Sequence, residues 1–145
     1  MPKAEFPYVP FHIAASEAQP NGSIAYRPLA AATITASNGN SIRFIVMPDS
    51  GADACVFPLS LAILLKLDVL NLPKAYTGGV GSQNNPTYYD AVTIDMGEGI
   101  VFKARAGFAA AMDTIGFGLL RQDGFFSQHN VEFRHAEKLF TVETL

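Results

Sequence analysis

The chain has one cysteine, few charges and no long hydrophobic run. The single cysteine, Cys55, excludes an internal disulfide and a cysteine-rich zinc site. Because Cys55 lies in an apolar stretch, we expect a buried thiol that packs as a small hydrophobic residue. The most apolar run, residues 56–65, contains Pro58 and Ser60 and is shorter than the roughly 20 residues that a membrane-spanning helix needs. The sequence therefore favours neither a disulfide scaffold nor a membrane anchor.

Charge is also scarce, at 16% of the residues with a net charge of −3. The lysines and arginines are scattered, so no basic stripe indicates nucleic acid or an anionic membrane as a partner. The histidines, His12, His129 and His135, lack metal-ligand spacing, and we expect neither a metal nor another cofactor. The first residues contain no apolar run of the signal-peptide kind. We expect a soluble cytoplasmic domain.

The length of 145 residues and the hydrophobic content of 49% suit one globular domain with a sizeable core. Residues 1–25 contain Pro2, Pro7, Pro10 and Pro20. This segment is expected to be an irregular N-terminal arm, with one edge strand near residues 8–13, before a domain over residues 26–145.

Short β-prone segments follow at regular spacing. Residues 29–35 and 42–46 flank Asn38-Gly39, a pair typical of hairpin turns. Residues 88–96 and 100–108 flank a glycine-rich turn, and residues 131–133 and 139–142 form a further expected hairpin. Short helices are predicted over residues 59–67 and 119–128. The pattern predicts a mostly-β barrel or sandwich.

One tetrapeptide carries recognisable chemistry: Asp49-Ser50-Gly51-Ala52, preceded by the apolar residues 44–47. A buried strand would deliver the carboxylate to a rigid position, and the glycine permits a tight turn. The hydroxyl can lock the loop by a hydrogen bond to neighbouring backbone. Asp49 is therefore the candidate catalytic residue.

With these residues the chain resembles the retropepsin-like aspartic proteases. The family signature is an apolar strand, Asp-Thr/Ser-Gly-Ala and often another aspartate, here Asp53. Residues 77–81 resemble the tip of the glycine-rich flap, and residues 118–126 resemble the second conserved loop with its helix. The resemblance covers roughly residues 27–142. It implies a closed or partly open β-barrel with one or two short helices.

The resemblance also implies a reaction in which two carboxylates share one proton and activate a water. The chain has only one Asp-Ser/Thr-Gly, so the second carboxylate would be Asp49 of another copy, across a twofold axis. The implied activity is a homodimeric endopeptidase that hydrolyses extended peptide or protein substrates. The resemblance assigns loop support to Ser50 and Gly51, substrate contacts to Gly51, Ala52, Asp53, Gly78, Gly79, Val80 and Gly81, and second-loop support to Arg121, Gln122 and Asp123.

Two positions depart from the family pattern. Pro48 stands before Asp49, and its missing N–H removes one possible loop hydrogen bond. Arg121 stands where glycine is expected and would crowd the loop, unless Gly118 takes the glycine's role in a shifted register. The family's arginine, which commonly pairs with the aspartate after the signature, would be replaced by Gln122 or supplied by Arg121.

These departures motivate an alternative function, a catalytically impaired binding or dimerisation module with the same fold. An unrelated small-molecule-binding β-barrel is a third hypothesis.

Overall fold

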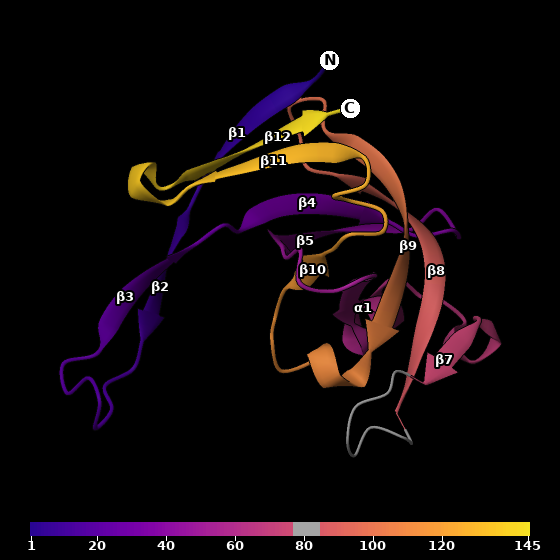
Figure 1. Ribbon diagram of the computed structural model, residues 1–145. Coiled ribbons are helices and arrows are strands. Elements are labelled where there is room, and N and C mark those ends of the chain that lie inside the picture. The colour runs from indigo at the N-terminus through magenta and orange to yellow at the C-terminus, as the bar shows by residue number, and fades with distance from the viewer. Residues whose placement is uncertain (77–84) are drawn as a thin grey trace.

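A closed β-barrel forms the body of the molecule. The computed structural model describes residues 1–76 and 85–145. Six strands follow one another in the order β4–β5–β10–β6–β9–β8, and β8 pairs back onto β4 to close the ring (Figure 1). Their bounds are β4 (Ala30–Thr35), β5 (Ser41–Pro48), β6 (Cys55–Pro58), β8 (Pro86–Asp95), β9 (Val101–Ala109) and β10 (Gly118–Leu120). A short strand, β7 (Lys74–Tyr76), extends the sheet beyond β8. The predicted mostly-β barrel is confirmed, and it is closed.

The structure confirms the three predicted hairpins. Their turns are specified by residues close together in sequence. Strands β4 and β5 join through a turn in which Gly39 adopts φ +87° and the Asn38 side chain accepts a hydrogen bond from the Asn40 amide. Strands β8 and β9 pair along their length. Strands β11 (His129–Arg134) and β12 (Leu139–Thr144) pair around a turn that contains Lys138 in the left-handed conformation.

Two hydrophobic clusters hold the barrel together. The larger one fills the interior and includes fully buried aromatic side chains, among them Phe57, Phe108 and Phe125. The smaller cluster consists of Leu29, Met112, Phe117 and Leu119, with partly buried residues of β5 and β6 packed against it. Strands β5, β6 and β10 therefore have apolar side chains on both faces, which fixes the strand ends from which the candidate site is built.

The helices are few and short. The helix α1 (Leu59–Leu64) lies within the predicted range 59–67, and three 3-10 turns complete the described part: η1 (Val69–Asn71), η2 (Ala110–Met112) and η3 (His135–Glu137). The helix predicted over residues 119–128 is wrong. Residues up to Leu120 form strand β10, paired to β5 and β6, and successive turns follow, with Gly124 at φ +99°. Strand pairing across the barrel overrides the local helical propensity.

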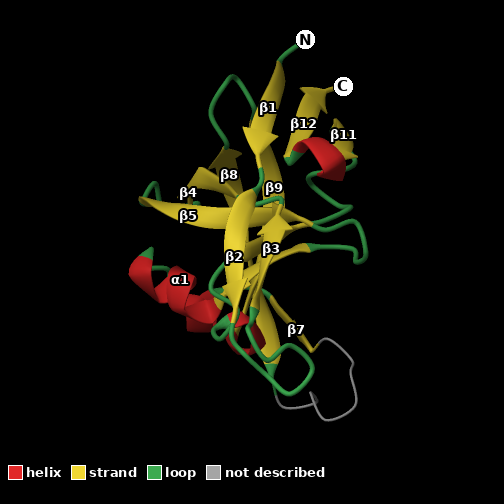
Figure 2. Ribbon diagram, turned by 90° about the vertical axis from the view of Figure 1, so that its left-hand side faces the viewer, coloured by secondary structure: helices red, strands yellow, loops and turns green. Residues whose placement is uncertain are grey.

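The N-terminal segment contains the edge strand expected near residues 8–13, but other parts of residues 1–25 are also ordered into strands, so the expected irregular arm is wrong. Strand β1 (Lys3–Pro7) pairs with β12 in the three-stranded sheet β1-β12-β11, and β2 (Val9–Ile13) pairs with β3 (Ser23–Arg27) in a separate hairpin (Figure 2). The prolines are accommodated at strand ends and in a two-stranded sheet, where one side of each strand needs no donor. No helix in the described residues has the length and apolarity needed to cross a membrane.

Candidate active site

Two parallel strands deliver the two candidate loops to the same place. Strands β5 and β10 run parallel, with Leu120 opposite Pro48. The Asp49 amide donates to the Leu120 carbonyl at 2.8 Å. Further along, the Gln122 amide donates to Ala52 at 3.2 Å, and the Asp123 amide donates to Asp53 at 2.7 Å. The loops 49–53 and 121–123 therefore form one backbone-bonded unit.

Asp49 is the first residue of its loop, and its side chain is 36% exposed. Its Oδ1 accepts a hydrogen bond from the Gly51 amide at 3.1 Å. A Cβ at Gly51 would lie 3.2 Å from that same oxygen, so glycine allows this close turn. The carboxylate is thereby oriented by its own loop and still reaches solvent.

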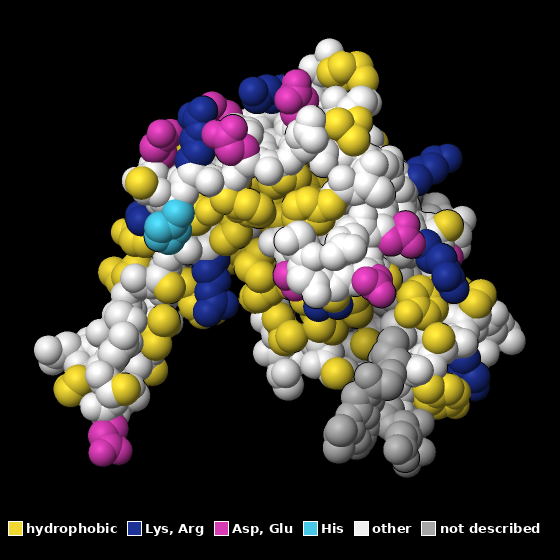
Figure 3. All heavy atoms as spheres, in the orientation of Figure 1, with side chains coloured by type: hydrophobic (Ala, Val, Ile, Leu, Met, Phe, Trp, Pro, Cys, Tyr) yellow, Lys and Arg dark blue, Asp and Glu magenta, His cyan; other side chains and the backbone are white. Residues whose placement is uncertain are grey.

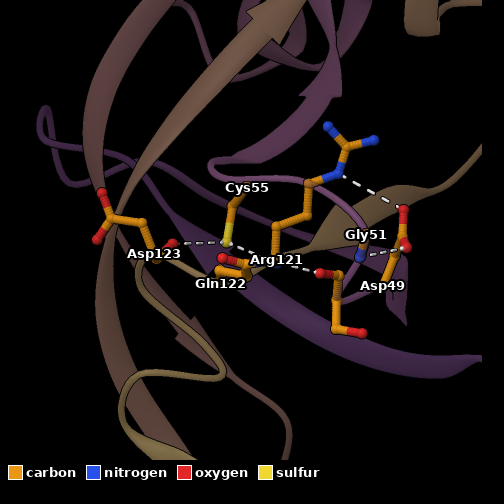
Figure 4. A network of polar contacts seen from close by, with 7 residues as sticks. Asp49, Gly51, Cys55, Arg121, Gln122 and Asp123 are labelled. Atoms are coloured by element: carbon orange, nitrogen blue, oxygen red, sulfur yellow. Dashed lines mark hydrogen bonds and ion pairs between the residues drawn. The ribbon is translucent and has the colours of Figure 1, made fainter.

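A side chain of the second loop fixes the middle of the first. Gln122 Nε2 donates to the Ser50 carbonyl at 2.7 Å (Figure 4). Within the described residues the Ser50 hydroxyl forms no hydrogen bond, and its predicted locking role across a dimer remains a prediction. Inside one copy the lock comes from Gln122, a contact that sequence reasoning missed.

Arg121 lies alongside Asp49 and does not displace the loop. Its Nε is 3.6 Å from Asp49 Oδ2 (Figure 4). That Nε is buried and has no hydrogen-bond acceptor among the described residues, so the contact with Asp49 is an ion pair without a close hydrogen bond. Arg121 therefore does not crowd the loop as expected, and its cationic side chain lies next to the candidate catalytic carboxylate. No local motif signals this pair, because the two residues come from different strands.

The shifted-register alternative for Gly118 is wrong. Gly118 is buried in β10 opposite Val46, inside the strand. A Cβ there would lie 2.4 Å from the Phe57 ring. Gly118 therefore makes room for a core aromatic ring and takes no part in the loop.

Pro48 costs the β5–β10 ladder no hydrogen bond. The amide that bonds to Leu120 belongs to Asp49. Successive amides of a strand point to opposite sides, so the Pro48 nitrogen faces away from β10. On that other side the pairing with β4 ends at Val46. The missing donor lies where no partner strand requires one.

Cys55 connects the second loop to β6. Its thiol is fully buried, as expected from the apolar context. Sγ accepts a hydrogen bond from the Arg121 amide at 3.3 Å and lies 3.5 Å from the Asp123 carbonyl, to which it donates. Desolvation, reinforced by the charge of Asp123, raises the thiol pKa, although the Arg121 amide acts in the opposite direction. A neutral thiol is therefore part of the loop support, which the sequence alone did not indicate.

A cavity of about 570 Å³ opens beside the paired loops. Ala52, Asp53 and Arg121 are among the residues that line it. Several small residues leave space in the lining, which also includes Ala54, Cys55, Val56, Thr87, Tyr89, Gly107, Ala109, Ala111 and Met112. The cavity is large enough for a side chain of a bound peptide.

Asp53 does not have the partner that the resemblance implied. In the part of the chain that the structure describes, neither Gln122 nor Arg121 forms an ion pair or hydrogen bond with its carboxylate. Gln122 bonds to Ser50 and Arg121 pairs with Asp49, because each side chain extends toward the start of the first loop. The Asp53 side chain is left exposed at the cavity.

The predicted flap residues Gly78, Gly79, Val80 and Gly81 lie outside the described residues. The strands on either side of them, β7 and β8, pair antiparallel with Tyr76 opposite Pro86. Across residues 1–76 and 85–145 no group of three or more His, Cys, Asp or Glu side chains is arranged to hold a metal ion.

Comparison with solved structures identifies a similar fold. The chain is similar to the crystal structure of a retropepsin-like aspartic protease from Rickettsia conorii, with a TM-score of 0.57 and 15% sequence identity. The alignment covers 98% of this chain and 95% of that one. No protein-family model and no curated protein sequence matches the chain. The likeness shows a retropepsin-like fold, which disfavours the hypothesis of an unrelated barrel.

Proposed function

We propose that the protein is a homodimeric aspartic endopeptidase that hydrolyses extended peptides, with Asp49 of each copy as the catalytic pair. The observation that carries the proposal is the position of the Asp-Ser-Gly carboxylate: it follows the end of β5, is oriented by the Gly51 amide and is open to solvent. The loop is tied to the 121–123 segment by backbone bonds. A group held in this way is preorganised for chemistry. The retropepsin-like fold supports the same reading.

In the proposed reaction, one copy supplies half of the machinery. Two Asp49 carboxyl groups about 3 Å apart would share one proton, because both cannot be ionised at that distance. The ionised group takes a proton from water as the water oxygen attacks the peptide carbonyl carbon, and the protonated group donates to the carbonyl oxygen. Collapse of the tetrahedral intermediate breaks the C–N bond and protonates the amine. The products are a carboxylic acid and an amine, with both catalytic groups restored.

The remaining residues position the reacting groups. Gln122 fixes Ser50, and Gly51 keeps the turn that orients Asp49. Ala52 and Asp53 would form one wall of the peptide-binding cleft, since they line the cavity next to the loop. Gly78, Gly79, Val80 and Gly81 keep their proposed role as a cover that closes over the bound peptide and excludes water.

Arg121 supplies positive charge at the point where the two Asp49 carboxyl groups would meet. Its Nε lies 3.6 Å from Oδ2 of Asp49 in the same copy. Opposite charges at about 4 Å attract by roughly 1 kcal/mol in water and by more in a less polar environment. In the proposed dimer two such arginines stabilise the negative charge that the proton-sharing Asp49 pair carries.

The test is the cleavage of an unbiased peptide library by the Asp49→Asn variant, with products identified by mass spectrometry. We expect a loss of at least about 100-fold in turnover, the usual contribution of a general acid or base. Asp95→Asn is a matched control, because Asp95 also accepts a hydrogen bond from the amide two residues later, Gly97, at 2.8 Å. Unchanged turnover in Asp49→Asn, with the control active, would overturn the proposal.

A second candidate is a retropepsin-like binding or dimerisation module that does not cleave peptides. The Arg121–Asp49 ion pair favours it, because the candidate catalytic carboxylate already has a cationic partner within its own chain. The same library distinguishes the two functions: peptide retention without cleavage supports the module, and cleavage that depends on Asp49 excludes it.

A further inference from the structure

The hairpin β2–β3, residues 9–27, projects from the molecule as an arm. Its two strands pair only with each other in the described part of the chain. Figures 1 and 2 show it extending away from the three-stranded sheet β1-β12-β11, alongside the barrel. We name this segment the hairpin arm. An isolated two-stranded hairpin is marginally stable at best in water, so its stability calls for a covering surface.

Both faces of the hairpin arm are apolar. The register, with Phe11 opposite Ala25 and His12 opposite Ile24, assigns the side chains to faces. One face bears Val9, Phe11 and Ile13, and the other bears Ile24 and Tyr26. These five side chains are 39 to 53% exposed. A hairpin that packs on one side only alternates apolar and polar residues, whereas this one presents hydrophobic groups on two sides.

Charge is nearly absent from the hairpin arm. Between Val9 and Arg27 the acidic and basic residues are Glu17, His12 and Arg27. Arg27 lies over the Phe11 ring at 4.1 Å, yet the ring remains 39% exposed. Aromatic and aliphatic side chains with few charges are typical of the buried centre of a protein–protein interface. The composition therefore indicates an interaction surface.

We propose that the hairpin arm packs against a second copy of this chain, each copy's arm reaching across a twofold axis onto the other's barrel. The first argument is area. The five exposed side chains offer on the order of 400 Å² of apolar surface per arm. In an isologous pair each arm and the surface that it covers occur twice. With both faces of each arm covered, the total is about 1,600 Å², the size of a standard stable interface.

The second argument is position. Strand β3 continues through Pro28 and Leu29 into β4, which pairs with β5, the strand that ends before Asp49. On β5, Ile45 is 44% exposed. It lies four residues before Asp49, or about 13 Å along an extended chain. Figure 3 shows hydrophobic side chains along the arm and an open space between the arm and the barrel. A copy seated in that space would cover the arm near the strand that leads to Asp49.

This inference rests on the proposed function only in requiring a second copy. It adds the surface that holds the two copies together, and it does not depend on peptide cleavage. The arm would give the dimer an interface outside the catalytic loops, so that the loops need not supply the association energy.

The test is sedimentation equilibrium from 1 to 100 µM with one substitution on each face, Phe11→Ser together with Ile24→Ser. We expect a dimer for the wild type and a dimer Kd at least 10-fold higher for the double variant. Leu70→Ser is the matched control, because Leu70 is 85% exposed in η1 and should leave Kd unchanged. Amide hydrogen exchange over residues 9–27 should be slow at high concentration and should accelerate on dilution.

Three results would overturn the inference: a monomeric wild type throughout that range, a dimer with the same Kd in the double variant, or a monomer whose arm is protected only by phosphatidylcholine–phosphatidylglycerol vesicles. Ile24→Lys provides a second variant if the double variant unfolds. The peptide-library assay separates the two proposals. If the arm variants weaken the dimer but the protein cleaves no peptide, the proposed function alone is contradicted. If cleavage depends on Asp49 but the arm variants leave the dimer Kd unchanged, the inference about the arm alone is contradicted.

Discussion

Arg121 Nε lies 3.6 Å from Asp49 Oδ2, so the candidate catalytic carboxylate meets a cation from the neighbouring loop of its own copy. The two residues follow the ends of the parallel strands β10 and β5, which explains why they meet. Both side chains reach solvent, and the pair by itself therefore adds little stability. Its effect should instead appear where two Asp49 carboxylates approach each other.

Arg121→Met should weaken the homodimer at neutral pH and low ionic strength. The substitution keeps much of the side-chain volume and removes the positive charge that stabilises the negatively charged Asp49 pair of the proposed dimer. An effect somewhat below 1 kcal/mol, after solvent screening, corresponds to an increase of about threefold in dimer Kd. Sedimentation equilibrium at 50 mM and 500 mM salt would measure it, and the difference should shrink at the higher salt.

The control for this prediction is Arg105→Met, since Arg105 is an exposed arginine that lies over the Tyr89 ring. Its dimer Kd should match that of the wild type. A dimer that is unchanged or tighter in Arg121→Met at low salt would contradict the assigned electrostatic role.

Gly118→Ala should destabilise the fold by about 1–3 kcal/mol, the usual cost of an extra carbon atom in a packed core. The new Cβ would lie 2.4 Å from the Phe57 ring, which is fully buried and packs against Phe44 and Phe108. Urea denaturation should show a lower midpoint with an unchanged slope.

A double-mutant cycle tests the stated cause of that loss. If the clash with the ring is responsible, Gly118→Ala should cost less in a Phe57→Leu background, and the two changes should not be additive. Equal cost in both backgrounds would show that the destabilisation has another origin.

Local turn chemistry explains which parts of the fold were predictable. The Asn38-Gly39 hairpin and the turn at Lys138 are determined by residues within a few positions of each other. The N-terminal strand was missed because its partner β12 lies at the opposite end of the chain. The helix expected over residues 119–128 is wrong for the same reason, because its first residues pair with strands that are distant in sequence. Pairing across the sequence outweighed local propensity.

The candidate site divides in the same way. The Asp49 loop was identified from a short motif whose geometry is local, including the bond from the Gly51 amide. The contacts of Arg121, Gln122 and Cys55 were not identified, because each joins segments that are far apart in sequence. Sequence spacing indicated that the second loop supports the first, but not which atoms make the contacts.

Cys55 should make the protein more sensitive to alkaline pH. Burial raises the pKa of the folded thiol above its ordinary value of 9.0. The stability that the neutral thiol contributes is therefore fully present below pH 9 and is lost as the pH rises above 9 through the raised value. Urea unfolding between pH 8 and pH 10.5 should show a steeper loss for the wild type than for Cys55→Ser.

The comparison isolates the thiol, because Tyr8, whose pKa is also raised by desolvation, is present in both proteins. The native thiol should also react slowly with an aromatic disulfide reagent at pH 8 and completely in denaturant. The same pH dependence in both proteins, or fast labelling of the native state, would contradict the buried neutral thiol.

The parallel pairing of β5 with β10 has a consequence for biosynthesis. The Asp49 segment is synthesised well before Leu120 and Gln122. While the ribosome is making the middle of the chain, the Asp49 amide therefore lacks its acceptor, the Leu120 carbonyl, and Ser50 lacks the hydrogen bond from Gln122. Contacts this distant in sequence must close a long loop before they form, which slows folding. A nascent polypeptide therefore carries its aspartate in an unformed loop, and the loop reaches its final geometry only after most of the chain has been synthesised.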